Sequence, residues 1–333
     1  MKSIPERDNV TAQTFQSEIL PAATPVVLRG LVSDWPVVKA GRQSPQALCD
    51  YVRTFDRGNT VPTMHGPPSI QGRFFYNDDL TAFNFQNGRA TIEASFRFLL
   101  GQLEEKRPAA HAIQSVPTRA NLPGFEQANP LPLLEDVEPR VWIGNSVIVA
   151  AHHDPSENIA CVVGGRRRFT LFPPEQLPNL YMGPFELTPA GTTISMVDFD
   201  APDFQRFPRF KQALEAALVA DLEPGDAVYI PYMWWHHVRS IESFNMLVNY
   251  WWATPKQGRG APNEAFLHAL LSIKHLPPAH RAAWRAVFEH YVFQTEVDPG
   301  EHLPEDKRGY LGSLSPEMVK AMRESLIRTM SRP

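Results

Sequence analysis

The sequence has few of the features that would place it outside the ordinary globular class. It contains only two cysteines, Cys49 and Cys161, too few for a disulfide framework or for a zinc site built from thiolates. No apolar run approaches the roughly 20 residues that a membrane-spanning helix requires, and the N-terminal MKSIPERDNV lacks the apolar core of a signal peptide. These absences favour a cytoplasmic protein with buried, reduced thiols and no membrane association.

Charge and composition narrow the class further. The 333 residues are 43% hydrophobic and 11% aromatic, which is enough to bury a sizeable core. The formal net charge is -4 and the only dense basic run is the three arginines at 166–168, so a broad basic surface for nucleic acid is not expected. We therefore expect the partner to be a protein, a peptide or a small molecule.

Three regions differ in their hydrophobic pattern. Residues 1–110 mix short strand-like runs with helical stretches for which Ser44 and Thr91 are candidate N-caps, and we expect this α/β segment to pack on the β-barrel region after it. Residues 111–254 consist of short runs rich in Val, Ile, Phe, Tyr and Trp between turn residues, which is typical of a β-sandwich or barrel. Residues 255–333 return to helical spacing.

A long segment, residues 173–224, interrupts the β-rich region. It is too long for a simple hairpin, and it holds the Pro-rich, acidic run VDFDAPDFQRFPRF followed by the helix-like run KQALEAALVADL. We interpret it as a structured insertion over one end of the barrel. Insertions of this kind often form lids or binding loops.

His152 and Asp154, in the run AAHHDPSEN, form a candidate metal-binding pair. A lone His-x-acid pattern is weak evidence, because 11 histidines and 36 acidic residues in 333 positions give about one such pair by chance. This pair, however, follows the strand-like run VWIGNSVIVA. Alternate residues of a strand share a face, so His152 and Asp154 can bind one ion while His153 points away.

The third ligand is expected from the run IPYMWWHHV, where a strand brings His236 and His237 beside bulky aromatic residues. Two imidazoles and one carboxylate on one face of an ion leave the opposite positions open, as in non-heme Fe(II) oxygenases. The alternative is that these histidines only form hydrogen bonds inside an aromatic core.

Arg167 is the candidate anchor for an anion. After Asp154 the chain runs NIACVV, turns at Gly164 and Gly165, and returns as RRRFTLF, so we expect a hairpin that places the arginines beside the metal-bearing end. A guanidinium fixed inside a barrel offers two parallel hydrogen bonds to a carboxylate, as a keto-acid cosubstrate would require. The alternative is that all three arginines are solvated or paired with nearby acids.

Taken together, six motifs in compatible order resemble the JmjC-type 2-oxoglutarate oxygenases, in the cupin-like subgroup that includes the asparaginyl hydroxylase inhibiting hypoxia-inducible factor. These motifs are VWIG, HHD, GGRRRFTLFPPEQLPNLY, VDFDAPDFQRFPRF, PGDAVYIPYMWWHHV and VNYWW. The resemblance covers most of residues 20–254. It implies a mainly β fold, a double-stranded β-helix of the cupin or jelly-roll type, with flanking N-terminal helices and a C-terminal helical region.

The resemblance also implies an activity and a set of site residues. The protein would be a dioxygenase that uses Fe(II), 2-oxoglutarate and dioxygen to hydroxylate an unknown substrate, with decarboxylation of 2-oxoglutarate to succinate. The residues that it implies for Fe(II) are His152, Asp154 and His236. The residues that it implies for the cosubstrate pocket are Arg167, Asn158, Asn249 and Trp251.

Several positions differ from the asparaginyl hydroxylase of that subgroup. Arg167 stands where the hydroxylase has a lysine, which preserves the charge. Its helper threonine is replaced by Val149, and Ala160 replaces a phenylalanine, which leaves more room. Thr193 and Ile194 occupy the positions of residues that hold its peptide substrate, so a different substrate is expected.

The last helical segment carries four apolar residues on one stripe at a four-residue step: Met318, Met322, Leu326 and Met330. By itself the stripe fits either packing on the chain's own core or a dimer interface. The family dimerises through C-terminal helices, so the resemblance favours a homodimer.

The residues alone leave two other classes of protein possible. One is a non-catalytic metal-binding cupin scaffold, and the other is a Zn- or Mn-dependent isomerase or hydrolase in the same barrel. A shell of two histidines and one carboxylate accepts several divalent ions, so oxygen consumption would separate these classes where metal identity would not.

Overall fold

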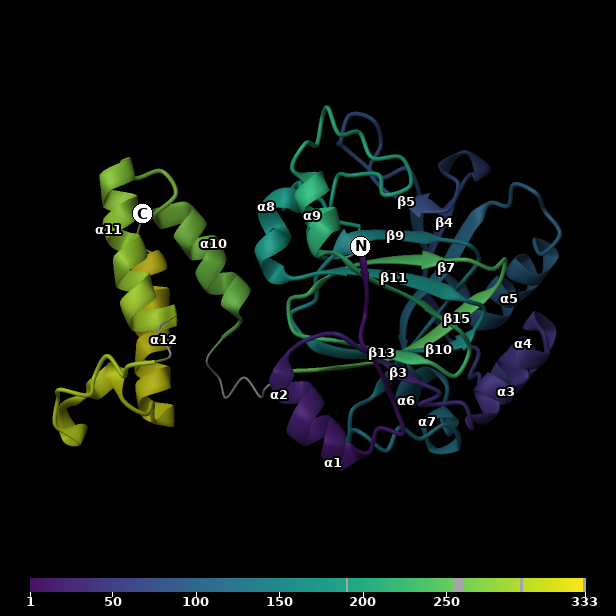
Figure 1. The fold of residues 1–333 in the computed structure, drawn as a ribbon, viewed down its shortest axis with the longest axis horizontal. Coiled ribbons are helices and arrows are strands. Elements are labelled where there is room, and N and C mark those ends of the chain that lie inside the picture. Colours follow the sequence, from purple (N-terminus) through teal and green to yellow (C-terminus); the bar gives the residue numbers. More distant parts are fainter. Residues whose placement is uncertain (190, 254–259, 294–295, 332–333) are drawn as a thin grey trace. The chain divides into compact units, whose positions relative to one another are not determined.

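The computed structural model describes residues 1–189, 191–253, 260–293 and 296–331. The chain divides into two compact units, Met1–Ala253 and Thr254–Pro333. In Figure 1 the first unit holds the β-sheets and the second is helical. Among the described residues, no helix has the length and apolar character needed to cross a membrane.

The centre of the first unit is a double-stranded β-helix. Its strands are β8 (Pro139–Gly144), β9 (Ile148–His152), β10 (Glu157–Gly164), β11 (Arg167–Phe172), β12 (Leu218–Leu222), β13 (Ala227–Ile230), β14 (Trp235–Ser240) and β15 (Asn245–Trp252). One antiparallel sheet has the order β13-β10-β15-β8 and the other the order β12-β11-β14-β9. Successive strands cross from one sheet to the other except at β11 and β12. The mainly β, cupin-type fold expected from the sequence is therefore confirmed.

N-terminal strands widen both sheets of the barrel. Within the described residues the sheets reach nine and six strands, because β2, β3, β4, β6 and β7 join the larger sheet and β1 and β5 the smaller. The bounds of these strands are β1 (Lys2–Ser3), β2 (Glu6–Asp8), β3 (Val26–Arg29), β4 (Thr60–Gly66), β5 (Arg73–Phe74), β6 (Gln86–Thr91) and β7 (Ala110–Pro117). The N-terminal segment is thus part of the same β-structure as the barrel.

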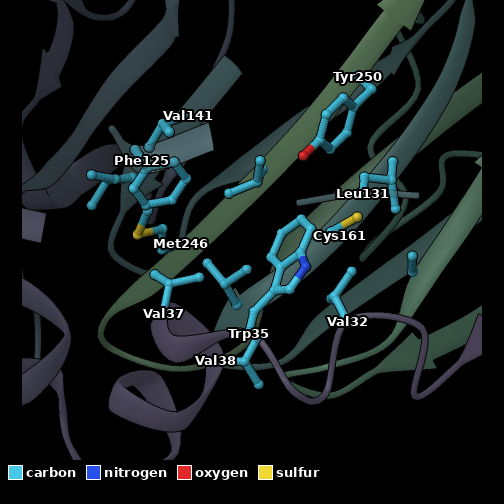
Figure 2. Packing of buried hydrophobic residues seen from close by; sticks show 14 of the residues in the cluster. Val32, Trp35, Val37, Val38, Phe125, Leu131, Val141, Cys161, Met246 and Tyr250 are labelled. Carbon is cyan, nitrogen blue, oxygen red and sulfur yellow. The ribbon is translucent and has the colours of Figure 1, made fainter. Parts of the chain in front are cut away.

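Helices of the N-terminal segment cover the outer face of the larger sheet. They are α1 (Ala12–Thr14), α2 (Leu20–Ala22), α3 (Pro36–Gln43), α4 (Pro45–Arg53), α5 (Ile92–Gly101), α6 (Thr118–Asn121) and α7 (Phe125–Ala128). Ser44 and Thr91 accept hydrogen bonds from the backbone N–H groups of Ala47 and Ala94, so both expected N-caps are confirmed. Figure 2 shows Trp35 among the side chains of this core, beside Cys161 of β10.

Strand alternation gives each sheet two faces with different roles. In β8, for example, Val141 and Ile143 pack in the core under the helices, while Trp142 packs against the core between the two sheets. Both cysteines are buried free thiols, and burial raises the pKa of Cys49 to about 12. The inner core lies between the sheets and holds the side chains that close the barrel.

The segment between β11 and β12 differs from the expectation at its end. After α8 (Leu177–Leu180), the run KQALEAALVADL is helical only in α9 (Phe210–Ala216) and then becomes β12. Residues 218–222 pair with β11 and with β1, and this pairing buries Ala220 and Leu222. The helix expected through residue 222 is wrong because this sheet pairing outweighs local helix propensity.

The expected hairpin at Gly164 and Gly165 is also wrong. β10 and β11 lie in different sheets, so these glycines form a corner where the chain crosses the barrel. Gly165 has φ +68°, and a Cβ there would lie 2.4 Å from Oδ1 of Asn245. β11 instead pairs with β14, which places Arg167 on the strand next to the one that carries His236.

The second unit consists of helices with a largely exposed apolar surface. They are α10 (Pro262–Ser272), α11 (Pro278–Phe288), which continues as a π-helix (Glu289–Phe293), and α12 (Pro316–Met330). Along the α12 stripe, Met318 and Met322 are half-buried, whereas Leu326 is 53% and Met330 58% exposed. The unit therefore does not bury the C-terminal end of this stripe within itself.

Candidate metal centre

Two strands of the smaller sheet bring the two expected histidine ligands together. His152 ends β9 and His236 is the second residue of β14, and the two residues are direct partners in the ladder. Their ring centroids are 4.2 Å apart. Asp154 follows β9 in the loop to β10, and one ligand atom from each of the three side chains lies within 4.8 Å of the others.

A β-bulge in β9 sets the direction of His152. His236 pairs with His152 and Val238 pairs with Val149, so β9 has one residue more than β14 between these two pairs. In a regular strand, residues three apart would point to opposite faces, but the extra residue lets Val149 pack in the inner core while His152 faces the centre. No pattern in the sequence indicates this bulge.

Hydrogen bonds orient both imidazole rings. Nδ1 of His152 lies 3.0 Å from the carbonyl oxygen of Ala150, and Nδ1 of His236 lies 3.1 Å from that of Trp234. A carbonyl oxygen only accepts, so each Nδ1 carries the proton and each Nε2 keeps its lone pair for a metal ion. In both cases the partner lies two residues earlier in the chain.

Asp154 completes an anionic donor set. Its Oδ2 lies 3.4 Å from Nε2 of His236 and, within the described part of the chain, is buried without a hydrogen-bond partner. Burial opposes ionisation, but the neighbouring histidines outweigh it and hold the pKa of Asp154 at about 2. Burial lowers the pKa of His152 to about 4. At neutral pH the centre thus offers a carboxylate and a neutral imidazole, which fits a divalent cation.

The second histidine of each pair points elsewhere. His153 packs on Trp235 with ring centroids 4.4 Å apart, as expected for a residue turned away from the centre. His237 stacks on Phe199 at 4.4 Å and 15°. Only one histidine from each pair therefore contributes to the candidate metal centre.

Arg167 is a buried cation inside the barrel. It is 6% exposed, and burial lowers its pKa to about 10, so the guanidinium stays charged at neutral pH. Its Nε has no partner, and no carboxylate of the described residues pairs with it. By contrast, Arg166 pairs with Glu242 at 2.6 Å and Arg168 with Asp221 at 2.7 Å on the surface. The alternative of paired arginines thus holds for these two neighbours alone.

The strand register relates Arg167 to the metal centre. Leu171 pairs with His236, and Arg167 pairs with Ser240 further along β14. Four residues of a strand span about 13 Å. Arg167 therefore lies deeper in the barrel than the metal ligands. The long arginine side chain and a short dicarboxylate together can span the distance between the two strand positions.

A chain of hydrogen bonds crosses the larger sheet between these two points. Nε1 of Trp142 donates to Oδ1 of Asn249 at 2.7 Å, and Nδ2 of Asn249 donates to Oδ1 of Asn158 at 3.2 Å. Trp251 packs edge-on against Trp142 with ring centroids 5.5 Å apart. The structure therefore gathers Asn158, Asn249 and Trp251 on one inner face. Trp142 was not predicted from the sequence as a site residue. In the run VWIG, strand alternation places it on the inner face, opposite its two neighbours, which pack under the N-terminal helices.

The insertion meets the barrel beside the metal centre. The N–H of Ser195 donates to the carbonyl oxygen of Ala151 at 2.8 Å. Thr193 and Ile194 are buried, and Ile194 packs with Tyr76 and Ala150. The residues that depart from the asparaginyl hydroxylase thus lie next to the strand that carries His152.

Comparisons with known proteins identify the relatives of this chain. A family model described as a cupin-like domain matches residues 12–258. Lysine-specific demethylase 8 of Danio rerio is 28% identical over 257 residues, covering 76% of this chain and 59% of the demethylase. The tRNA wybutosine-synthesizing protein 5 of Gallus gallus is 37% identical over 266 residues, covering 75% of this chain and 76% of that protein. HSPB1-associated protein 1 of Homo sapiens is 36% identical over 171 residues, covering 50% of this chain and 33% of that protein.

Proposed function

This chain belongs to the cupin-like JmjC family, and we propose that it is an Fe(II)- and 2-oxoglutarate-dependent oxygenase that hydroxylates its substrate. The observation that carries the proposal is a pair of incomplete sites on the inside of one barrel. Within the described part of the chain, three potential metal-ligating side chains converge, one of them with a carboxylate oxygen that has no hydrogen-bond partner, and a buried guanidinium without an acid lies deeper in the barrel. A metal ion and a dicarboxylate would satisfy both.

The residues present fit the proposed groups. His152, Asp154 and His236 would hold the iron, and Arg167 would hold the distal carboxylate of 2-oxoglutarate. When bound, the iron would supply the dioxygen chemistry that couples decarboxylation of the keto acid to oxidation of a substrate C–H bond.

The protein's own contribution is positioning and exclusion of water. The backbone carbonyls of Ala150 and Trp234 hold both rings in one tautomer, and burial keeps the imidazole of His152 neutral. Phe169 and Val238 belong to the apolar core between the two sheets, which would limit the access of water to a bound cosubstrate.

Oxygen consumption and succinate release test this proposal. With Fe(II) and 2-oxoglutarate, the wild-type protein is expected to form succinate, and His152→Ala or Asp154→Ala to reduce the rate by at least about 100-fold, because each removes a ligand. His153→Ala is the matched control and is expected to keep the activity, since its ring faces Trp235. Equal succinate formation in all variants would contradict a metal centre at these residues, and turnover of a substrate without oxygen would favour a Zn- or Mn-dependent isomerase or hydrolase that uses the same three ligands. Absence of 2-oxoglutarate binding would favour a scaffold.

The relatives leave the substrate open. One relative is named as a lysine demethylase and another as a tRNA-modifying protein. Hydroxylation and demethylation start from the same oxidation of a C–H bond, so the demethylase's name is compatible with the proposed chemistry. The chain spans 59% and 53% of lysine-specific demethylase 8 of Danio rerio and of Xenopus tropicalis, and we propose an oxygenase of a protein, peptide or small-molecule substrate rather than their whole function.

We also propose that the protein is a homodimer joined through its C-terminal helices. Large apolar side chains of α10, α11 and α12 are exposed in the second unit, among them Leu271 at 76% and Ile327 at 63%. A second copy that covers this surface would remove it from water.

A further inference from the structure

Arg140 is a second arginine on the inner face of the barrel. It is the second residue of β8, whose Val141 and Ile143 pack in the core under the N-terminal helices. Alternation along the strand therefore turns Arg140 to the same side as Trp142, which packs in the inner core. Unlike Arg167, Arg140 is half-buried and so is partly accessible to solvent.

The strand register places Arg140 at the metal end of the barrel. β10 begins three residues after Asp154, and its Asn158 pairs with Trp251 of β15. Arg140 pairs with Asn249, two residues before Trp251 in the same strand. We call the three residues Arg140, Asn158 and Trp251 the mouth of the barrel.

A distortion in β7 holds the guanidinium in place. Nη1 of Arg140 donates to the carbonyl oxygen of Ser115 at 3.1 Å and to its Oγ at 3.0 Å. Ser115 has φ +48° and lies at a register shift between Ile113 and Val116. A bulged residue leaves the ladder, so both oxygens of Ser115 are free to accept. One side of the guanidinium is thereby fixed.

The other side of the guanidinium has donors without acceptors. Among the residues that the structure describes, Nε and Nη2 of Arg140 have no hydrogen-bond partner and no carboxylate forms an ion pair with it. Its Cζ lies 5.9 Å from the ring centroid of Trp251, whose own Nε1 is buried without a partner in the part of the chain that the structure describes. Glu157, at the start of β10, already accepts from the hydroxyl of Tyr229 and the N–H of Tyr232.

We propose that Arg140 and Trp251 bind an anionic group of the substrate, a carboxylate or a phosphate, at the mouth of the barrel. The fork of Arg140 supplies charge and two parallel donors, and Nε1 of Trp251 supplies a third donor. Among the described residues Nε1 of Trp251 is a buried donor without an acceptor, which is costly, so a ligand that brings an oxygen atom gains affinity there, and the charge of Arg140 favours an anionic one. The inference rests on the proposed function, because only an enzyme has a substrate at this mouth.

Binding of small anions, measured without turnover, tests the inference. The protein is loaded with Zn(II) and saturating 2-oxoglutarate, which occupies Arg167, and methyl phosphate or acetate is then titrated. The indole N–H resonance of Trp251, assigned by its loss in Trp251→Phe, is followed by NMR. A saturable shift is expected, and Arg140→Gln is expected to weaken it by about tenfold or more, since a charge-assisted pair of hydrogen bonds is lost.

Matched variants separate recognition from a structural role. Arg140→Lys keeps the charge without the fork, so intermediate binding is expected. Arg166→Gln removes a surface arginine paired with Glu242 and should bind like the wild type. Tighter binding of methyl phosphate supports a phosphate-bearing substrate, and tighter binding of acetate a carboxylate-bearing one. No shift with either anion, or an equal shift in a folded Arg140→Gln protein, would overturn the inference. Absence of 2-oxoglutarate binding in the same sample would instead count against the proposed function.

Discussion

A buried charge without an acid sets Arg167 apart from its two neighbours. Arg166 and Arg168 each meet a carboxylate on the surface, whereas Arg167 between them is buried in an apolar core and pairs with no carboxylate of the described residues. An uncompensated buried charge destabilises the folded state. The proposed role of Arg167 in binding a dicarboxylate would account for this cost in stability.

Replacing Arg167 by methionine should therefore separate binding from stability. In the metal-loaded protein, Arg167→Met is expected to weaken 2-oxoglutarate binding by about 10- to 100-fold, because charge-assisted hydrogen bonds are lost. In the ligand-free protein the same change should raise the free energy of unfolding by about 1 kcal/mol, because a desolvated charge is removed. Calorimetric titration and urea unfolding measure the two effects. Arg168→Met is the control for binding, and a loss of stability in Arg167→Met would contradict this account.

Buried histidines make stability depend on pH outside the metal centre too. His111 lies under α5 with Nε2 2.9 Å from the hydroxyl of Ser95, and burial lowers its pKa to about 4. In the unfolded chain the pKa returns to about 6.5. The unfolded state therefore binds more protons below pH 6.5, and this group's stabilising contribution is lost as pH falls from 6.5 towards 4.

His111→Gln should remove this part of the pH dependence. Between pH 7 and pH 5 the wild-type protein is expected to lose about 2 kcal/mol more unfolding free energy than the variant, from the shift of this one group. Urea unfolding of the metal-free protein at both pH values measures the difference. His275→Gln, at an exposed position, is the control, and equal pH dependence of all three proteins would contradict the assignment.

At the scale of elements, irregularities place the functional side chains. The bulge in β9 directs His152, the bulge in β7 frees Ser115 to hold Arg140, and the corner at Gly165 moves β11 into the sheet of β14. Each bulge breaks the regular alternation of a strand by one residue, and the corner redirects the chain between β10 and β11. The side chains of the candidate site are therefore positioned by local irregularities in an otherwise regular β-barrel.

The corner at Gly165 can be tested by adding one methyl group. In Gly165→Ala the new Cβ would lie 2.4 Å from Oδ1 of Asn245 and 2.5 Å from the carbonyl oxygen of Phe244, at φ +68°. We expect a loss of about 3 kcal/mol or more of unfolding free energy, from backbone strain and steric overlap together. Gly58→Ala is the matched control, since Gly58 has φ +73° with no atom within 4 Å of the added Cβ, and it should lose only about 1 kcal/mol. Equal losses in thermal or urea unfolding would show that the corner has no steric role.

At the scale of the whole molecule, the two units differ in how they bury apolar surface. The first unit has cores between and outside its sheets, whereas the helices of the second leave large apolar residues exposed. A helical unit of this kind gains stability from a partner surface. The proposed homodimer supplies one.

A charge placed on the α12 stripe tests the dimer. Leu326→Glu is expected to shift the protein from dimer to monomer in sedimentation velocity at micromolar concentration, because a carboxylate would be buried in an apolar interface. Lys320→Glu, an exposed change on the same helix, is the control and should remain dimeric. A wild-type monomer, or a dimer that Leu326→Glu leaves intact, would refute the proposal.

The fold class and the three side chains that meet at the candidate metal centre could be predicted from the sequence because their signals are local. Short runs of β-branched and aromatic residues between turns indicate strands. The motifs around His152 and His236 lie next to such strand-like runs, which favours a metal-binding role for these histidines. Both errors concerned long-range pairing. The run KQALEAALVADL has good helix propensity, and only its place beside β11 makes its end a strand. Two glycines between strands indicate a hairpin until the sheets are known.

The sequence by itself determined which side chains are available for chemistry: two imidazoles, a carboxylate and an arginine in strand-like surroundings. Only the tertiary structure decided what each of them meets. Within the residues that it describes, it showed that Arg167 is buried without an acid while its neighbours are paired, that Asp154 keeps an oxygen without a hydrogen-bond partner, and that Arg140 lies at the mouth of the barrel. The reason is physical. Burial and the absence of a counter-charge depend on which strands pack together, and strand pairing is a long-range property that no local pattern encodes.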